Sequence, residues 1–216
     1  MNKIEKEVSY NISNSYSTLN SLTAKTNTIW LACHGIGYLS KYFLKYFDDL
    51  DPVKNYIIAP QAQSKYYLGS RYTHVGASWL TKENTTVEIK NVLRYLDAVL
   101  LAEELPKDIN FIILGYSQGV SVVIRYVASR KLKCTHLVLM SGGIPKELNP
   151  EDFEFLKEQT EVSMFYGTED EYLNKARLNY EKQRFKELFG TDAKITPFEG
   201  KHELKKECLS DLVQGN

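Results

Sequence analysis

The 216-residue sequence has no surplus of either charge, because Lys and Arg together number 27 and Asp and Glu together also number 27. Proteins that bind nucleic acid usually carry a basic surplus, so its absence argues against such a partner. No apolar stretch is long enough to cross a membrane, and residues 1–7 lack the apolar core of a signal peptide. We therefore expect no nucleic-acid partner and no integral membrane segment.

Cysteine is scarce as well. The three cysteines are an odd number and form no paired motif: Cys33, Cys134 and Cys208. Such a set indicates neither a disulfide framework nor a zinc site and suits a reducing compartment, so we expect a cytoplasmic protein. Internal repeats and linkers rich in Pro, Gly or Ser are also missing. The length fits one domain over residues 1–216, and the oligomeric state stays open.

From Thr28 onward, predicted strands and helices alternate, which favours an α/β fold with a mostly parallel central sheet and helices on both faces. The predicted strands are 28–33, 56–59, 109–114, 134–140, 161–166 and 193–197, and the predicted helices are 84–104, 120–128, 150–159 and 173–189. Residues 8–12 and 16–19 predict an N-terminal antiparallel hairpin at one sheet edge. Thr85 and Glu88 predict a capping box. The short interval between Met140 and Glu161 leaves no room for a helical cap domain.

The residues Gly115-Tyr116-Ser117-Gln118-Gly119 join the predicted strand 109–114 to the predicted helix 120–128. A Gly-x-Ser-x-Gly pentapeptide at a strand-to-helix corner is typical of the nucleophile elbow, which holds a serine hydroxyl out at the top of a sheet. A Cβ at either glycine would collide with the neighbouring strand or helix. Because Gly and Ser are common, the pentapeptide alone is a weak signal, and the flanking elements are what favour an elbow.

A serine nucleophile needs a histidine to take its proton and a carboxylate to hold that histidine, and after an elbow they follow in the order Ser, acid, His. Two histidines follow Ser117. His136 begins a predicted strand, at the end remote from the elbow, so we expect it to be structural. His202 lies in a polar loop after the last predicted strand, and such a loop can return to the serine. The sequence therefore predicts His202 as the general base.

The acid is expected in the loop after the predicted strand 161–166, where Glu169, Asp170 and Glu171 crowd together. Acidic residues also favour the first turn of a helix, and a predicted helix begins just afterwards. A Gly-x-x-Asp turn places its carboxylate past the strand end. This ranks Asp170 first and Glu169 second.

An oxyanion hole requires two preorganised N–H donors. The Gln118 amide, directly after Ser117 at a helix N-terminus, is one expected donor. The second should come from the loop His34-Gly35-Ile36-Gly37 after the predicted strand 28–33, and we expect it to be the Ile36 amide. A histidine in the place of His34 is expected to brace the loop. Cys33 is expected to be a buried thiol at the strand end.

Taken together, these motifs resemble the phospholipase/carboxylesterase group of α/β-hydrolases, which includes acyl-protein thioesterases. The matching pieces run in the family's order from about residue 28 onward: 33–37, 59–63, 115–119, 167–170 and 200–202. The resemblance implies the triad Ser117, Asp170 and His202, with the oxyanion donors Ile36 and Gln118, and it favours Asp170 over Glu169. It implies no metal and no organic cofactor.

Two departures from the family's pattern concern the substrate. Tyr38 stands where the family commonly has Asp, and residues 60–79 form a long, irregular segment with several aromatic side chains. Such segments are usually functional or disordered. This one could form a wall over an acyl groove or a loop pinned to the sheet by its own aromatics, and both interpretations stay open. The candidate substrate contacts are Tyr38, Tyr67, Tyr72 and Trp79.

The function that follows is serine-dependent hydrolysis of a carboxylic ester, with a small-molecule ester or lipid-like substrate. Thioesters are attacked by the same groups, so the sequence does not separate ester from thioester cleavage, and the acyl-chain length is open. Fold does not fix function. The alternatives are a ligand-binding protein on the same scaffold that turns over slowly or not at all, and an acyltransferase or peptidase.

Overall fold

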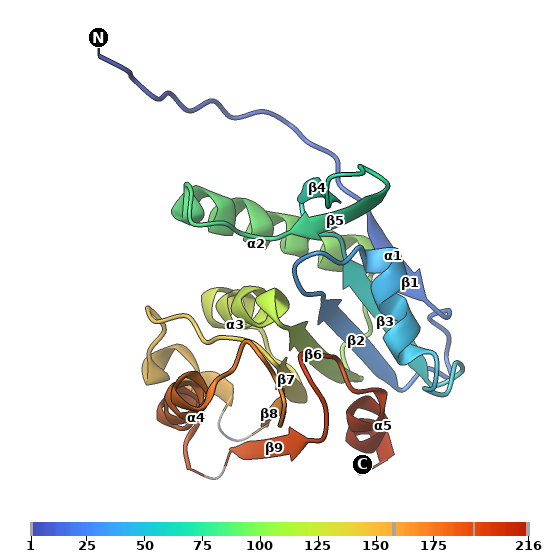
Figure 1. Ribbon diagram of the computed structural model, residues 1–216. Helices are drawn as coiled ribbons and strands as arrows, with labels where there is room; N and C mark the ends of the chain where they lie inside the picture. The colour runs from blue at the N-terminus through green and yellow to red at the C-terminus, as the bar shows by residue number, and fades with distance from the viewer. Residues whose placement is uncertain (1, 157–158, 192, 215–216) are drawn as a thin grey trace.

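A seven-stranded sheet runs through the computed structural model, which describes residues 2–156, 159–191 and 193–214 (Figure 1). Across the sheet the strands are β1 (Tyr16–Leu19), β3 (Asn55–Pro60), β2 (Thr28–Cys33), β6 (Asn110–Tyr116), β7 (His136–Met140), β8 (Glu161–Gly167) and β9 (Lys194–Phe198). Neighbouring strands are parallel except for the pair of β1 and β3. The predicted, mostly parallel sheet is confirmed.

Helices cover both faces of this sheet. Helices α2 (Thr85–Ala102), α3 (Gln118–Arg130) and α4 (Lys175–Phe189) pack into one core, while α1 (Ser40–Phe43), the 3₁₀ helix η1 (Leu44–Phe47) and α5 (Lys206–Gln214) pack into the other (Figure 1). Because strand side chains alternate between faces, Ile29 and Leu31 of β2 enter the first core and Trp30 enters the second. The predicted α/β-hydrolase architecture is confirmed, and the residues that the structure describes form no cap domain.

The N-terminal antiparallel pair is present, but its partner differs from the predicted one. β1 pairs with β3, with Tyr16 opposite Pro60, whereas residues 8–12 form no strand and are exposed. Figure 1 shows this segment extending away from the body. Just before β1, the Tyr95 hydroxyl donates to the Ser15 carbonyl at 2.6 Å. The edge of β3 offers β1 a hydrogen-bonding partner that residues 8–12 do not reach.

Residues 60–79 are more regular than the sequence predicted. They contain a separate two-stranded hairpin of β4 (Ser64–Leu68) and β5 (His74–Ser78), with Ser64 opposite Ser78. Every residue of β4 is exposed. The expectation of an irregular segment failed because β4 is exposed throughout and β5 is buried only from Gly76 to Ser78, so the segment lacks the regular alternation that marks a strand in sequence.

Two local predictions about helices are wrong. α2 begins after Asn84, which has a left-handed conformation, and Thr85 Oγ1 donates to the Thr81 carbonyl at 2.8 Å, so no capping box forms. In the interval 150–159, the described residues form two 3₁₀ turns, η2 (Pro150–Asp152) and η3 (Glu154–Leu156), in place of one helix. Positions 157–158 lie outside the described residues.

The parallel strands bring several loops to one edge of the sheet, because the carboxyl ends of parallel strands lie side by side. β6 lies between β2 and β7, and β8 and β9 follow beyond β7. The segments after β2, β6, β8 and β9 carry the predicted triad and oxyanion residues. Among the described residues, no helix combines the length and apolar character needed to cross a bilayer.

Candidate active site

Ser117 lies at the corner between β6 and α3 in a strained conformation, with φ 53° and ψ −116°. Its amide donates to the Met140 carbonyl of β7 at 2.9 Å. The turn is tight: a Cβ at Gly119 would overlap the Cys33 carbonyl oxygen, and one at Gly115 would lie 2.6 Å from the Gly119 oxygen. A positive φ in a serine persists only where its surroundings hold it, and these contacts do so.

A hydrogen-bonded chain runs from Ser117 to His202 and on to Asp170. His202 Nε2 lies 2.8 Å from Ser117 Oγ, and His202 Nδ1 lies 2.8 Å from Asp170 Oδ2. The Asp170 side chain is fully buried and that of His202 is 17% exposed. Because a carboxylate only accepts, Nδ1 carries the proton and Nε2 can accept the proton of the serine hydroxyl. The structure thus brings together the three residues that the sequence ranked first.

The other sequence candidates lie elsewhere. Glu169 is exposed, and its backbone amide, rather than its carboxylate, contacts the histidine loop by donating to the Gly200 carbonyl at 2.9 Å. His136 is buried at the start of β7, where its Nε2 lies 2.9 Å from Ser163 Oγ. Burial lowers the pKa of His136, and the nearby Glu161 partly opposes this. His136 thus lies at the end of β7 remote from Ser117, as predicted.

Two tyrosines enclose the His202 ring. The Tyr116 ring lies 5.6 Å from it, and the Tyr172 ring meets it edge to face at 4.7 Å. The Tyr116 hydroxyl donates to the His202 carbonyl at 2.8 Å, and the Tyr172 amide donates to Asp170 Oδ1 at 2.9 Å. Neither tyrosine was predicted from the sequence as a neighbour of His202. Their proximity to Ser117 and Asp170 in sequence was the available signal, but only the fold turns them toward the imidazole.

Two backbone amides border the serine. Gln118 is the first residue of α3, so its amide has no acceptor within the helix. In the loop after β2, the Gly37 amide donates to the Ala77 carbonyl at 2.8 Å and the Tyr38 amide to the Gly35 carbonyl at 3.3 Å. Among the residues that the structure describes, no acceptor bonds to the Ile36 amide. A Cβ on Gly35 would lie 3.0 Å from Ser117 Cβ, so this loop passes close to the serine.

His34 braces that loop from inside the core. Its Nδ1 lies 2.8 Å from the Gly35 carbonyl and its Nε2 accepts from the Ala62 amide at 3.2 Å. Burial lowers the pKa of His34 to about 4, although the bond to Gly35 partly opposes this. The neutral imidazole is therefore the form that holds the loop. Burial also raises the pKa of the Cys33 thiol, which is fully buried at the end of β2.

Trp79 corrects one sequence prediction. It was expected to contact substrate, but it is fully buried, and its Nε1 donates to the His34 carbonyl at 2.8 Å. Its ring lies 5.1 Å from that of His34. Its large apolar ring completes the core under the loop, and its one polar atom has a partner there. Trp79 therefore supports the loop after β2 instead of facing a groove.

The Gln118 side chain has a structural role that was not predicted from the sequence. Its Oε1 accepts from the Trp79 amide at 2.8 Å, and its Nε2 donates to Ser78 Oγ at 3.0 Å and to the Leu80 carbonyl at 2.7 Å. These bonds join the start of α3 to the end of the β4–β5 hairpin. The residue after the serine thus fixes the hairpin at its base.

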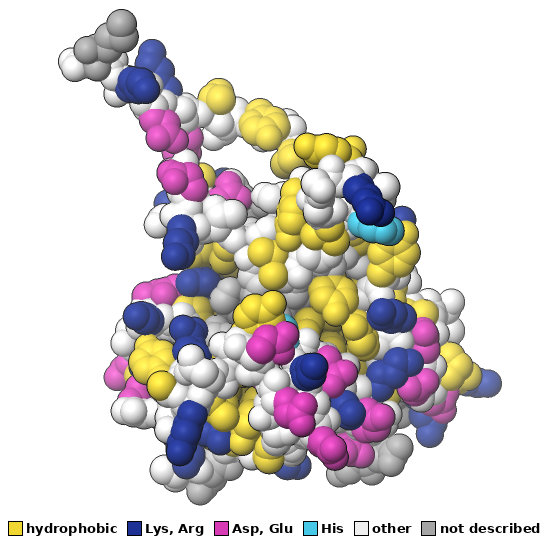
Figure 2. Space-filling view, viewed as in Figure 1, with side chains coloured by type: hydrophobic (Ala, Val, Ile, Leu, Met, Phe, Trp, Pro, Cys, Tyr) yellow, Lys and Arg dark blue, Asp and Glu magenta, His cyan; other side chains and the backbone are white. Residues whose placement is uncertain are grey.

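The remaining predicted substrate contacts lie at or near the surface. Tyr67 and Tyr72 are 57% and 71% exposed on the hairpin, with their rings edge to face at 5.3 Å. Tyr38 is half-buried, and its hydroxyl lies 3.0 Å from the Tyr46 hydroxyl. Figure 2 shows hydrophobic side chains gathered over the hairpin and below it on the same face. The exposed apolar residues there include Ile36, Tyr66, Tyr67, Leu68, Tyr72 and Val75.

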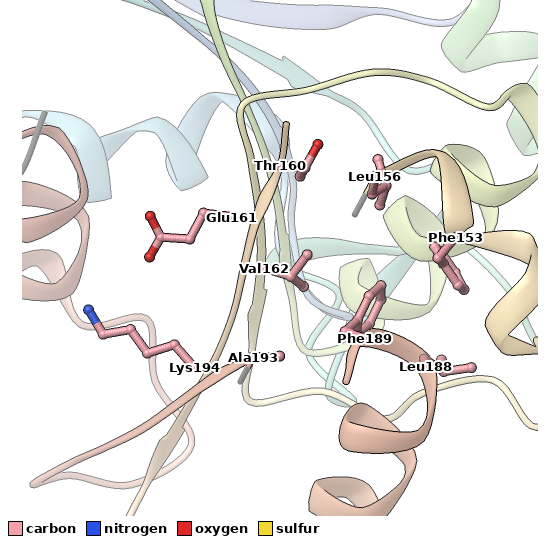
Figure 3. Close-up of a pocket in the computed structure, with 9 residues that line it drawn as sticks. All are labelled: Phe153, Leu156, Thr160, Glu161, Val162, Leu188, Phe189, Ala193 and Lys194. Carbon is pink, nitrogen blue, oxygen red and sulfur yellow. The ribbon is translucent and has the colours of Figure 1, made fainter. Parts of the chain in front are cut away.

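A separate hollow of about 470 Å³ lies at the opposite end of the sheet (Figure 3). Its lining includes Glu161 and Lys194, at the amino ends of β8 and β9, on one side of the β8 ribbon and Val162 and Phe189 on the other. Because Ser117 lies at the carboxyl end of β6, this hollow is not part of the site. Among the described residues, no three His, Cys, Asp or Glu side chains gather as possible metal ligands.

Comparison with known proteins places these features in a family. The model of the phospholipase/carboxylesterase family matches residues 15–214. Acyl-protein thioesterase 2 of Zea mays superposes with a TM-score of 0.69 at 14% identity, covering 94% of this chain and 97% of that one. A phospholipase/carboxylesterase of Dyadobacter fermentans gives 0.64 at 17% identity, covering 96% and 97%. Esterase PE8 gives 0.66 at 17% identity, covering 94% and 99%. No curated protein sequence matches the chain.

Proposed function

The chain belongs to the phospholipase/carboxylesterase family of α/β-hydrolases, and on that premise we propose that it cleaves carboxylic esters through an acyl-enzyme on Ser117. One observation carries the proposal. Asp170, His202 and Ser117 are joined by two hydrogen bonds of 2.8 Å each at the carboxyl edge of the sheet. This is the arrangement that nucleophilic acyl transfer by serine requires.

In the first half of the proposed reaction, Ser117 Oγ attacks the acyl carbonyl carbon and its proton passes to His202 Nε2. Asp170 holds the Nδ1 proton and stabilises the imidazolium that forms. The negative charge on the carbonyl oxygen is stabilised by the Ile36 and Gln118 amides, and the positive end of the α3 dipole favours the same charge. His202 then gives its proton to the departing alcohol, leaving the acyl group on Ser117.

In the second half, a water molecule gives a proton to His202 Nε2 and attacks the acyl-enzyme carbonyl. The same two amides stabilise the second oxyanion, and His202 returns the proton to Ser117 Oγ as the acid departs. A thioester would follow the same steps with a thiol as the leaving group. The three cysteines are free and buried, and a reducing cytoplasm stays a prediction from the sequence.

We assign the acyl side of the substrate to the exposed apolar face of the hairpin. A Cβ on Gly37 would lie 3.8 Å from the Tyr66 hydroxyl and 3.9 Å from Leu68 Cδ2, so this face adjoins the loop that carries Ile36. Tyr67 and Tyr72 continue the same hairpin outward. Such amphipathic rings suit a substrate that is apolar along its chain and polar at its ester.

Labelling with a fluorophosphonate probe tests the proposal. We expect one covalent adduct on Ser117, located by mass spectrometry, and none in Ser117→Ala. Ser121→Ala is the matched control, because Ser121 lies one turn along α3 with its hydroxyl bonded to the Gln118 carbonyl, and it should label like the parent. An adduct that does not depend on Ser117, or none at all, would favour a ligand-binding protein on this scaffold.

The substrate class can then be measured with nitrophenyl esters of increasing acyl length and with matched thioesters. A kcat/KM that rises with chain length would support the hairpin as the acyl surface. A preference for acetyl esters would contradict that assignment and leave the Ser117 chemistry intact. Product analysis with added alcohols or amines identifies an acyltransferase, because the acyl group then appears on the acceptor.

A further inference from the structure

The loop that carries His202 is attached to the body on both sides of that residue, and Leu204 packs into the second core. On its approach from β9, the Thr168 amide donates to the Phe198 carbonyl and the Glu169 amide to the Gly200 carbonyl, both at 2.9 Å. Beyond those bonds, Glu203 bonds within the loop, its amide donating to the Lys201 carbonyl at 3.0 Å. Asp170 holds the imidazole of His202, and the backbone of His202 lies between these attachments, where a contact to its carbonyl can restrict it further.

One side chain makes such a contact. Tyr116 immediately precedes Ser117, and its hydroxyl donates to the His202 carbonyl at 2.8 Å. The Tyr116 side chain is almost completely buried, and its bond to His202 is partly shielded from water. A single residue thus supplies the backbone that enters the nucleophile turn and the hydroxyl that holds the histidine loop.

The aromatic rings around Tyr116 hold its hydroxyl in this direction. Its ring stacks on Phe43 at 6.3 Å and meets Tyr38 edge to face at 5.9 Å. The Tyr38 hydroxyl is itself 3.0 Å from that of Tyr46. Burial raises the pKa of Tyr116, and the nearby phenols of Tyr38 and Tyr46 add to the effect. The phenol is therefore a neutral donor at neutral pH and well above it.

We propose that the Tyr116 hydroxyl is a positioning group that fixes the backbone of His202 and so sets the distance between His202 Nε2 and Ser117 Oγ. The inference rests on the proposed function of Ser117 and His202 and adds a residue to it. Tyr116 touches neither substrate nor the reacting atoms. It acts by removing freedom from the imidazole, because small misplacements of a proton acceptor are costly in catalysis.

Tyr116→Phe tests this role, since it deletes one oxygen and keeps the buried ring. We expect kcat for a short nitrophenyl ester to fall by about three- to ten-fold, the factor that corresponds to one net hydrogen bond. KM should be unchanged, because the lost interaction does not bind substrate. The rate of Ser117 labelling by the fluorophosphonate should fall by the same factor. In NMR spectra, the imidazole N–H proton shared with Asp170 should broaden or shift.

Tyr56→Phe is the matched control. Tyr56 is a buried phenol on β3, in the other core, whose hydroxyl donates to Glu103 Oε2 at 2.6 Å. Its loss should lower the melting temperature without changing kcat or the imidazole signal. Replacing Tyr116 with 4-aminophenylalanine keeps an N–H donor at the same ring position and should restore part of the lost kcat.

Unchanged labelling, kcat and imidazole signal in a folded Tyr116→Phe protein would overturn the inference. The NMR measurement does not require turnover, so it can reject the positioning role even in a chain that hydrolyses nothing. Conversely, absence of a Ser117-dependent adduct in the parent protein would refute the proposed function, and the imidazole signal would still report whether Tyr116 orders His202.

Discussion

Ser117 shows at the scale of one residue how the fold maintains an unfavourable conformation. A non-glycine residue with φ 53° costs on the order of 1–3 kcal/mol. The hydrogen bond from its amide to the Met140 carbonyl holds it in place, and so does the backbone of Gly142, which passes close to it just after β7. The strained turn presents the hydroxyl to His202, which a relaxed helix start would not do. Strain and the proposed reactivity thus have one geometric origin.

In the proposed mechanism, Asp170 acts through the charge and hydrogen-bonding character of its carboxylate more than through its size. Asp170→Asn keeps the shape of the side chain but replaces a pure acceptor by a group that also donates, so His202 can adopt the wrong tautomer. We expect kcat to fall by roughly 10³- to 10⁴-fold with the fold retained. Steady-state kinetics and a melting curve check this.

Glu169→Gln is the control for that change. Glu169 lies in the same turn, but its side chain is exposed, so kcat should stay within about two-fold of the parent, as for most surface substitutions. Equal losses in the two variants would mean that charge in the turn matters and that the bond to His202 does not.

At the scale of elements, the β4–β5 hairpin and the loop after β2 are built as one unit. Gly37 donates to the Ala77 carbonyl, and a Cβ at Gly76 would lie 2.6 Å from the Gly37 oxygen. The Gln118 side chain ties the base of the hairpin to α3. The position of the Ile36 amide therefore depends on a hairpin distant from it in sequence.

The Gln118 side chain can be tested apart from its amide. Gln118→Ala keeps the backbone donor but leaves the Trp79 amide without its partner and the Leu80 carbonyl with only the Ser78 hydroxyl, which should destabilise the fold by about 1–3 kcal/mol. Hydrogen exchange at the Trp79 amide should accelerate, and kcat should fall. Gln63→Ala is the matched control, since its side chain makes one long bond of 3.5 Å to the Asn91 carbonyl, and it should change neither quantity.

Gly76→Ala tests whether the hairpin must lie close to the loop after β2. The added methyl would overlap the Gly37 backbone and force the two apart, so we expect a loss of about 1–3 kcal/mol in stability together with a lower kcat. Chemical denaturation and esterase assays measure both. Thr73→Ala, at an exposed position in the turn of the same hairpin, should be neutral, and an equal effect there would point to a general weakness of the hairpin.

At the scale of the whole molecule, two cores on opposite faces of the sheet hold the carboxyl edge in shape. The first contains α2, α3 and α4, and the second contains α1, η1 and α5. Polar residues are buried in this interior, including His34 and His136. A buried neutral histidine links the stability of the whole fold to pH.

For His34, the direction in which folding stability changes with pH follows from its pKa. Its pKa is about 4 in the folded protein, against an ordinary value of 6.5, so the unfolded chain binds more protons between these values. Its contribution to stability is therefore complete above pH 6.5 and is lost as pH falls toward 4, where the loss reaches about 3 kcal/mol. Denaturant unfolding at about pH 7, 5.5 and 4.5 measures it.

The variant His34→Gln isolates this contribution. It should be less stable than the parent at neutral pH but should lose stability less steeply as the pH falls. His136, whose pKa burial also lowers, contributes equally in both proteins and cancels in the comparison. Parallel pH profiles for parent and variant would show that His34 is not the group responsible.

Much of the fold and the central candidates of the site could be predicted from sequence because their signals are local. β2 was predicted with its observed bounds, since a short apolar run next to glycines marks a buried parallel strand. The order of Ser117, Asp170 and His202 after an elbow follows from the connectivity of a parallel sheet. Asp170 ranked above Glu169 because a short turn limits which side chain can point back.

Only the tertiary structure decided the contacts between segments that are distant in the chain. The pairing of β1 with β3, the hairpin standing on the loop after β2, and the burial of Trp79 all depend on which surfaces meet after folding. Tyr116 has the same neighbours in sequence whether or not its hydroxyl reaches His202, 86 positions away, so the sequence does not reveal this contact. Residue type and local spacing determine which groups can react, and long-range packing determines which groups hold them in place.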